Sequence, residues 1–364
     1  MKKLHLLQSW GTILRGKSPL LSIEITRECP LSCPGCYAYG ESHLGGEGTL
    51  RDVSDFRGDQ LVNGILGLIE KHDPIQVSLV GGEPLIRHRE LSRVLPVLSE
   101  RGTYAMVVTS AVIPIPEFWT DLPRVTVAVS VDGLAPEHDV RRRPATYDRI
   151  LRNIEGRRVN IHCTIVRAHV EQPGYLEQFL AFWSARPEVN RIWFSVYTPQ
   201  RGESTPEMLT PEQRVRLADG LPAMARRFPK LMLPDGMARA FAAPPNNPAE
   251  CLFSKMSVNY TADLKTTVEP CVFGGDPDCS QCGCSISAGL HWIGAVRVAG
   301  PLKVEHLVRG SMAIGERVHR AFPHHTELPR WSRNAPPQAP LVQIASSADR
   351  DYASTDSKQT SLKN

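Results

Sequence analysis

The sequence has 364 residues, enough for one large domain and a smaller one, and its hydrophobic fraction of 41% can supply a sizeable core. Its formal net charge is +4, and because lysines and arginines are scattered along the chain, we expect no nucleic-acid partner. No stretch approaches the roughly 18 consecutive apolar residues of a membrane span, and the first residues lack the pattern of a secretory signal, so we expect a cytoplasmic protein without a membrane span.

Strand and helix patterns alternate over most of the chain. We predict strands at 20–28, 75–80, 104–109, 125–131, 159–166 and 191–197. Helical patterns follow them at 59–71, 90–101, 147–155, 175–185 and 210–228. This alternation indicates βαβ units and a parallel sheet, which predicts an α/β fold in the form of a partial (β/α)6 TIM-type barrel. In such barrels the site lies at the carboxyl ends of the strands.

Three cysteines, Cys29, Cys33 and Cys36, follow the first predicted strand with the spacing C-x3-C-x2-C. Three thiolates on one short loop can hold three irons of a [4Fe-4S] cluster and leave the fourth iron open to another ligand. A zinc knuckle is the alternative, but zinc needs a fourth Cys or His nearby, and none follows within a short distance, since the nearest is His43. The spacing therefore favours a catalytic iron–sulfur cluster.

This motif and its position after the first strand resemble the radical S-adenosylmethionine (SAM) enzymes. The resemblance implies that SAM chelates the open iron and that one electron cleaves it to methionine and a 5′-deoxyadenosyl radical, which abstracts hydrogen from a substrate. It also implies an electron donor such as flavodoxin or ferredoxin. Tyr37, directly after the third cysteine, is expected to cover the cluster or the adenine of SAM.

Gly81, Gly82, Glu83 and Pro84 close the second predicted strand. Glycines allow a close backbone approach to a ligand, and a carboxylate can accept hydrogen bonds from an ammonium group. Taken alone, the run is an ordinary Gly-Pro turn. One βα unit after the cysteines, it resembles the GGEP motif of the same family, which implies that Gly82 and Glu83 bind the SAM amino group.

Ser130 and Asp132 end the fourth predicted strand, where alternation places both side chains on one face. Two polar groups facing a barrel interior need partners, and the two hydroxyls of a ribose are suitable ones. Residues capping a strand end are the alternative. The resemblance to the family also implies that Arg143 reaches the SAM carboxylate, with Arg141 and Arg142 as alternatives. Without that resemblance, three consecutive arginines are typical of a solvated loop.

A second group of cysteines lies near the C-terminus, at Cys251, Cys271, Cys279, Cys282 and Cys284. Between the first two, residues 257–268 predict a β-hairpin around Asp263. This arrangement resembles the SPASM or twitch extensions of the family, which implies one auxiliary [4Fe-4S] cluster with one thiol left over. A structural zinc site with four thiolates is the alternative. Cys163 stands alone, and we interpret it as a small buried apolar residue.

These observations predict α/β architecture with a small C-terminal iron–sulfur extension, divided into five segments. The segments are an N-terminal segment at 1–18, the radical SAM partial barrel at 19–240, the auxiliary-cluster region at 241–295, a C-terminal packing segment at 296–335 and a tail at 336–364 that we expect to be disordered.

The leading hypothesis for function is a radical SAM enzyme acting on a peptide. The same chemistry on a lipid or another small metabolite is an alternative. A non-catalytic zinc or iron–sulfur protein on a barrel scaffold is the rival from another class, and it leaves Gly82, Glu83, Ser130 and Asp132 without a role.

Overall fold

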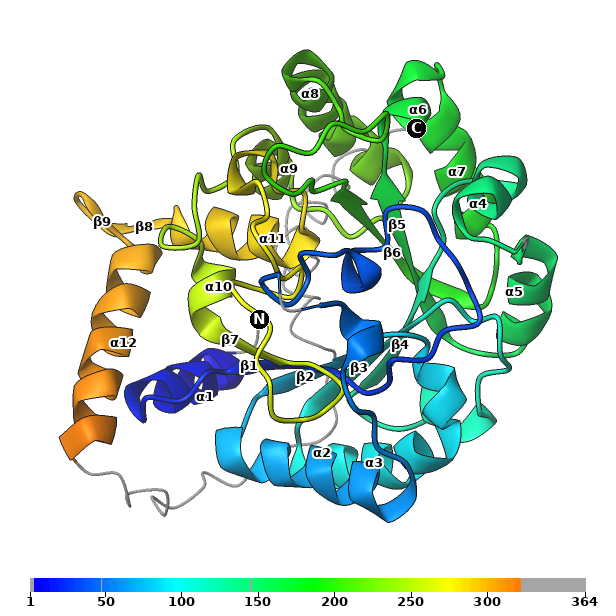
Figure 1. Cartoon of the computed structure of the whole chain (residues 1–364). Coiled ribbons are helices and arrows are strands. Elements are labelled where there is room, and N and C mark those ends of the chain that lie inside the picture. The colour runs from blue at the N-terminus through cyan, green and yellow to red at the C-terminus, as the bar shows by residue number, and fades with distance from the viewer. Residues whose placement is uncertain (1–2, 47, 145, 322–364) are drawn as a thin grey trace, which may run out of the picture.

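A seven-stranded parallel sheet forms the centre of the protein in a computed structural model, which describes residues 3–46, 48–144 and 146–321 (Figure 1). The strand order is β6-β5-β4-β3-β2-β1-β7, and β6 and β7 are its two edges. The strands are β1 (Leu20–Glu24), β2 (Gln76–Val80), β3 (Tyr104–Thr109), β4 (Val125–Ser130), β5 (Val159–Ile165), β6 (Val189–Val196) and β7 (Ser257–Tyr260). The predicted α/β partial barrel is therefore confirmed, and the sheet is not closed.

Helices cover the sheet and extend beyond it. They are α1 (Lys3–Leu14), α2 (Gly58–His72), α3 (His88–Arg101), α4 (Ala135–Arg141), α5 (Tyr147–Ile154), α6 (Arg167–Glu171), α7 (Tyr175–Ser184), α8 (Pro211–Arg227), α9 (Asp235–Ala242), α10 (Leu252–Met256), α11 (Ser285–Gly294) and α12 (Val304–Ala321). A small antiparallel pair, β8 (Arg297–Ala299) and β9 (Leu302–Lys303), precedes α12. The start of helix α8 has a local cause. The Thr210 hydroxyl caps the helix by accepting a hydrogen bond from the Gln213 amide, and Pro211 occupies the first helical position.

The two faces of the sheet differ in chemistry because side chains alternate along each strand. One face carries apolar side chains such as Leu21, Ile23 and Val129, which pack with the helices into the main core. The other face carries a mixture that includes many polar ones, and pairing in register sets Ser22 beside Asn259 and Ser130 beside His162. We call this polar side the inner face; it is the side on which the candidate ligand-binding residues lie.

The seventh strand is where the prediction for residues 257–268 was incomplete. The turn around Asp263 is present, since its carboxylate accepts from the Lys265 and Thr266 amides at 2.9 and 2.8 Å, and Tyr260 and Thr267 form an antiparallel bridge. However, Ser257–Tyr260 also pairs in parallel with β1. The spacing of residues in the sequence cannot reveal a pairing between segments more than 200 positions apart.

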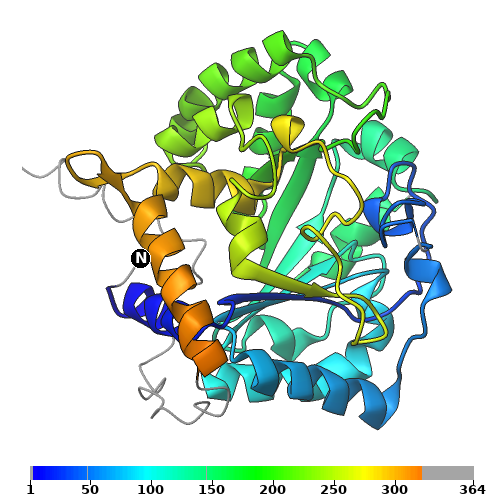
Figure 2. The ribbon, with the colours of Figure 1, turned by 60° about the vertical axis from the view of Figure 1, so that its left-hand side comes forward.

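The first and last described helices pack together. Figure 2 shows α1 in blue beside α12 in orange, and the Trp10 indole donates to the Ser311 hydroxyl at 2.9 Å. Ile13, Leu252, Met256 and Val308 form a small second core between these helices and α10. The predicted segment limits remain predictions, and the predicted tail at 336–364 lies outside the described residues. No helix among the described residues is long and apolar enough to cross a membrane.

Candidate functional site

The first cysteine group lies on the loop that follows β1, at the carboxyl end of the sheet. The Cys36 amide donates to the Cys33 carbonyl at 3.4 Å, and Gly35 between them has a φ of +67°. A Cβ at Gly35 would lie 3.2 Å from the Glu207 carboxylate, so glycine suits this tight turn. Burial raises the pKa of Cys29 to about 11, and Glu83, Cys33 and Cys36 act in the same direction. The three thiols and Glu83 thus share one neighbourhood.

Gly81 and Gly82 bring the end of β2 against the segment that leads into Cys29. Both have positive φ, and a Cβ on Gly82 would overlap the carbonyl oxygen of Glu28. The Glu83 amide donates to the same carbonyl at 2.8 Å. The close approach predicted for these glycines is therefore made to the chain itself, and it fixes the start of the cysteine loop.

The Glu83 carboxylate is buried and fully engaged. One oxygen accepts from the Leu85 amide at 3.0 Å and from the Thr109 hydroxyl, and the other accepts from the amide of Ser110 at 2.8 Å and from its hydroxyl. Two carboxylate oxygens offer about four acceptor positions. A SAM ammonium group would therefore have to displace one of the two hydroxyls, and the predicted contact stays a prediction.

Asp132 is the charged centre beside the cysteines. Its side chain is fully buried; one oxygen accepts from the Thr164 amide at 3.1 Å, and the other pairs with Arg142 at 2.8 Å and with Arg141. Burial acts to raise the pKa of Asp132, but Arg142, Arg141 and the Thr164 amide together hold it well below its usual range. Asp132 is thus held ionised by the two arginines.

The three consecutive arginines have different positions. Arg141 forms a two-point ion pair with Glu207, at 2.7 and 2.9 Å, as well as its pair with Asp132. Burial raises the pKa of the Cys33 thiol, and the positive charge of Arg142 opposes this rise. Arg143 is exposed, and its Nε donates to the Val140 carbonyl at 3.0 Å. The structure therefore brings Arg141 and Arg142 to Asp132 and the cysteines, and it leaves Arg143, the residue predicted from the resemblance, at the surface.

A buried pair, Glu24 and His43, joins the two cysteine regions. His43 Nε2 lies 2.8 Å from a Glu24 carboxylate oxygen, and Nδ1 lies 3.0 Å from the carbonyl of Phe273, between Cys271 and Cys279. A carbonyl only accepts, so Nδ1 carries hydrogen. The ring of Tyr37 packs against Phe273 and His43 at 5.6 and 5.8 Å between centroids. In Figure 1 the dark-blue segment after β1 and the yellow segment after β7 accordingly lie side by side.

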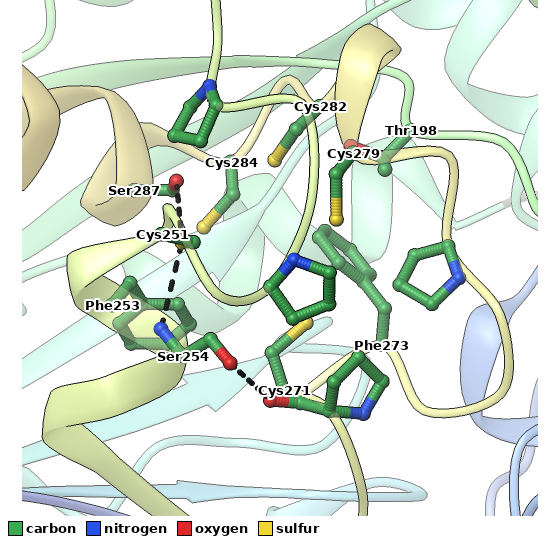
Figure 3. Close-up of a pocket in the computed structure, with 14 residues that line it drawn as sticks. Thr198, Cys251, Phe253, Ser254, Cys271, Phe273, Cys279, Cys282, Cys284 and Ser287 are labelled. Carbon is green, nitrogen blue, oxygen red and sulfur yellow. Dashed lines mark hydrogen bonds between the residues drawn. The ribbon is translucent and has the colours of Figure 1, made fainter.

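The second cysteine group lines one hollow (Figure 3). Its walls include all five thiols, Cys251, Cys271, Cys279, Cys282 and Cys284, together with Phe253, Phe273 and several prolines. Cys251 lies 3.3 Å from the Ser287 hydroxyl, and burial raises the pKa of Cys284 to about 12. All five cysteines therefore line one largely apolar hollow, although Cys251 is 20 positions before the next cysteine.

Gly283 ties the hollow to the end of β6. Its carbonyl accepts from the Val196 amide at 2.9 Å, and its amide donates to the Thr198 hydroxyl at 2.8 Å. A Cβ there would overlap the Val196 carbonyl. The next residue but one, Ser285, donates its amide to the Ser195 hydroxyl, which also contacts His162 at 2.9 Å. The hollow thus adjoins the inner face of the sheet.

Comparison with known proteins gives the family. The model of the radical SAM superfamily matches residues 23–170, which contain Cys29, Cys33, Cys36, the Gly82–Glu83 turn and Asp132. Residues 23–170 are therefore a radical SAM domain. This family consists of enzymes and implies a [4Fe-4S] cluster and SAM.

Individual proteins resemble the chain at low sequence identity. The 7-carboxy-7-deazaguanine synthase of Methanocaldococcus jannaschii is 23% identical over 131 residues, 34% of this chain and 51% of that protein. The chain thus spans about half the length of this curated relative. The structure of anSMEcpe with bound AdoMet has a TM-score of 0.52 at 13% identity, covering 83% of this chain and 99% of that one. Streptococcus suis SuiB bound to its precursor peptide SuiA has a TM-score of 0.50 at 14% identity, covering 71% and 61%. These structures support the fold.

Cys163 and Tyr197 have plain structural roles. Cys163 is buried in the main core, as predicted. The Tyr197 hydroxyl donates to Glu203 at 2.7 Å. Within residues 3–46, 48–144 and 146–321, no three His, Cys, Asp or Glu side chains converge closely enough to hold a single metal ion.

Sequence reasoning missed Glu24, His43 and Arg214 in this radical SAM chain. Glu24 carries a signal in retrospect, because an acidic residue inside an apolar strand is costly unless it has a partner. From the sequence, His43 stands out only as the histidine nearest to the first three cysteines. Arg214 carries no such signal, since arginines on a helix are usually exposed. Its side chain donates to four backbone carbonyls around the second cysteine group.

The Glu24–His43 pair predicts a pH dependence of stability. Burial lowers the pKa of His43, but the hydrogen bond and charge of Glu24 outweigh it and raise the pKa above the usual 6.5. The resulting stability is complete below pH 6.5 and is lost as the pH rises through the raised value. We expect His43→Gln to lower the free energy of unfolding of the iron-loaded protein, measured with denaturant. This loss relative to the wild type should shrink as the pH rises, by at most about 1.4 kcal/mol per pH unit.

His72 provides a matched control with the opposite sign. Burial lowers the pKa of His72 to about 4, so the stability due to neutral His72 is complete above pH 6.5 and is lost as the pH falls toward 4. The loss in free energy of unfolding caused by His72→Gln should accordingly shrink at low pH. A deficit for His43→Gln that stays constant between pH 6 and 9 would contradict the assignment of a raised pKa to His43.

Proposed function

We propose that this chain is a two-cluster radical SAM enzyme, in which Cys29, Cys33 and Cys36 hold the reducing cluster and the hollow holds an auxiliary [4Fe-4S] cluster. When bound, the first cluster and SAM supply a 5′-deoxyadenosyl radical that takes hydrogen from the substrate. The observation that carries the two-cluster proposal is the convergence of five thiols on one hollow beside the first cysteine region. Each iron of a cluster takes its own thiolate, so thiols distributed around a space suit a multi-iron group.

The SAM site in this proposal lies between the first cysteines and the ends of β2 and β4. Gly82 and Glu83 fix one side, and Ser130 and Asp132 bound the other. For the SAM carboxylate we propose Arg142, with Arg141 beside it, in preference to Arg143. Arg142 forms an ion pair with Asp132, and its positive charge lies close enough to Cys33 to influence that thiol. Tyr37 lies where it can cover the first cluster on the side that faces the hollow.

Four of the five cysteines in the hollow would ligate the auxiliary cluster. All five line its walls, and we propose Cys251 and Cys271 as ligands, with the thiol left over being one of Cys279, Cys282 and Cys284. The rings of Phe253 and Phe273 would shield the cluster from water. Because the hollow adjoins the inner face, an auxiliary cluster held there could exchange electrons with a substrate bound on that face. As the external electron donor we propose a flavodoxin or a ferredoxin.

A peptide is the substrate class we propose to test first. SuiB, which resembles the chain in fold, was solved with a precursor peptide bound. The polar inner face, with Ser130, His162 and Ser195, offers hydrogen-bond partners to a peptide backbone or its polar side chains.

Anaerobic reconstitution of the wild-type chain and of Cys271→Ala tests the two-cluster proposal. We expect about eight irons per wild-type chain, from two four-iron clusters, and about four in the variant, whose remaining cluster still binds SAM. Iron and sulfide analysis with Mössbauer spectroscopy measures this. A wild-type chain that binds about four irons, or that takes zinc into the second cysteine group in the presence of iron, would refute the auxiliary cluster.

A further inference from the structure

Arg214 on α8 is a buried arginine whose four hydrogen bonds all go to backbone carbonyls. Arg214 is only 5% exposed. Nη1 donates to the carbonyls of Phe241 and Cys282 at 3.0 and 3.3 Å, and Nη2 donates to the carbonyls of Tyr197 at 3.1 Å and of Gln281. One guanidinium thus joins α8, α9, the end of β6 and the loop that carries Cys279, Cys282 and Cys284.

The positive charge of Arg214 lacks a carboxylate partner among the described residues. Asp278, the acidic group whose charge acts on it, uses its own oxygens for Ser280 and for the side chain of Gln281. A buried charge without an opposite charge is costly. Four carbonyls reduce this cost through their dipoles, but they leave the net charge in place.

The fifth donor of the guanidinium is also unused. Nε is buried and has no hydrogen-bond partner within the described chain, whereas the other four N–H groups are all satisfied. Buried donors are rarely left unpaired. An unbalanced cation and a free donor beside Cys282 both indicate that a negatively charged group with acceptor atoms belongs in this neighbourhood.

We propose that Arg214 is the charge partner of the auxiliary cluster, a role that rests on the auxiliary cluster of the proposed function. An iron–sulfur cluster with thiolate ligands is anionic, and its sulfur atoms accept hydrogen bonds. Arg214 positions the ligand loop through the Gln281 and Cys282 carbonyls and stabilises the reduced cluster, which carries one more negative charge than the oxidised one. Its charge therefore raises the reduction potential of the auxiliary cluster.

The test compares full-length variants in a Cys29→Ala, Cys33→Ala, Cys36→Ala background, in which the auxiliary cluster is the only one expected. Arg214→Gln removes the charge and Arg214→Lys keeps it without the planar fork. Arg216→Gln is the matched control, because Arg216 is an exposed arginine two positions further along α8. Iron and sulfide content, together with a potentiometric titration followed by electron paramagnetic resonance, are the readouts.

We expect Arg214→Gln to lower the ratio of reduced to oxidised cluster at a fixed potential about tenfold, which is 59 mV for a one-electron couple. Arg214→Lys should restore most of this ratio, and Arg216→Gln should leave it unchanged. An iron-loaded Arg214→Gln with the ratio of its parent would overturn the proposal. If Arg214→Gln binds no iron, Arg214→Lys decides: iron binding with a near-parental ratio supports the charge role, and a folded but iron-free Arg214→Lys contradicts it. Absence of iron from the parent would instead refute the auxiliary cluster itself.

Discussion

Replacing Cys33 by alanine should abolish reductive SAM cleavage. In the iron-loaded, reduced protein, release of 5′-deoxyadenosine should fall to background, and iron content should fall from about eight to about four per chain. The physical reason is that three thiolates are the minimum that leaves only one iron open to SAM. Loss of one exposes a second iron, and Gly35 within the Cys33–Cys36 turn has no side chain that could replace the lost thiolate.

Cys163→Ala is the matched control for this experiment. Cys163 lies on β5 within the apolar core and is 1% exposed. We expect this variant to keep the iron content and the 5′-deoxyadenosine yield of the wild type. Wild-type yields from Cys33→Ala, measured by liquid chromatography and mass spectrometry, would exclude Cys33 as a ligand of the reducing cluster.

The second large effect is expected at Asp132. Asp132→Asn removes the buried negative charge that Arg141 and Arg142 share, and loss of one partner of a buried ion pair costs about 3–5 kcal/mol. The free energy of unfolding, from denaturant titration of the iron-loaded protein, should fall by about that amount.

Asp148→Asn is the control for charge removal in the same region, because Asp148 is exposed on α5. Its effect should stay within about 0.5 kcal/mol, as is usual for surface substitutions. If Asp132→Asn is no more destabilising than Asp148→Asn, the two arginines do not depend on Asp132 for their charge balance.

The sequence alone was sufficient for the features that depend on local order. Six strands appear within a few residues of their predicted limits, since alternation and β-branched residues act within a strand. Cys29, Cys33 and Cys36 were identified because their spacing is itself the chemical signal. The turn around Asp263 followed from a side chain that binds its own neighbouring amides.

Features that depend on tertiary contacts could not be predicted in this way. The pairing of β7 with β1 and the burial of Arg214 both join distant segments. Arg141, Arg142 and Arg143 are equivalent as letters, and only the path of the chain after α4 decides that Arg142 faces Asp132 while Arg143 faces solvent. Likewise, nothing near Glu24 in sequence predicts that His43 and the Phe273 carbonyl complete its surroundings.

The most direct test of the central claim is the release of 5′-deoxyadenosine from SAM by the anaerobically reconstituted, reduced wild-type chain. We predict release that requires the reductant, the iron and the intact Cys29, Cys33 and Cys36 motif. A chain that binds four or more irons in this preparation and yet releases no 5′-deoxyadenosine above the reductant-only background would contradict the proposal that this protein is a radical SAM enzyme acting through that motif.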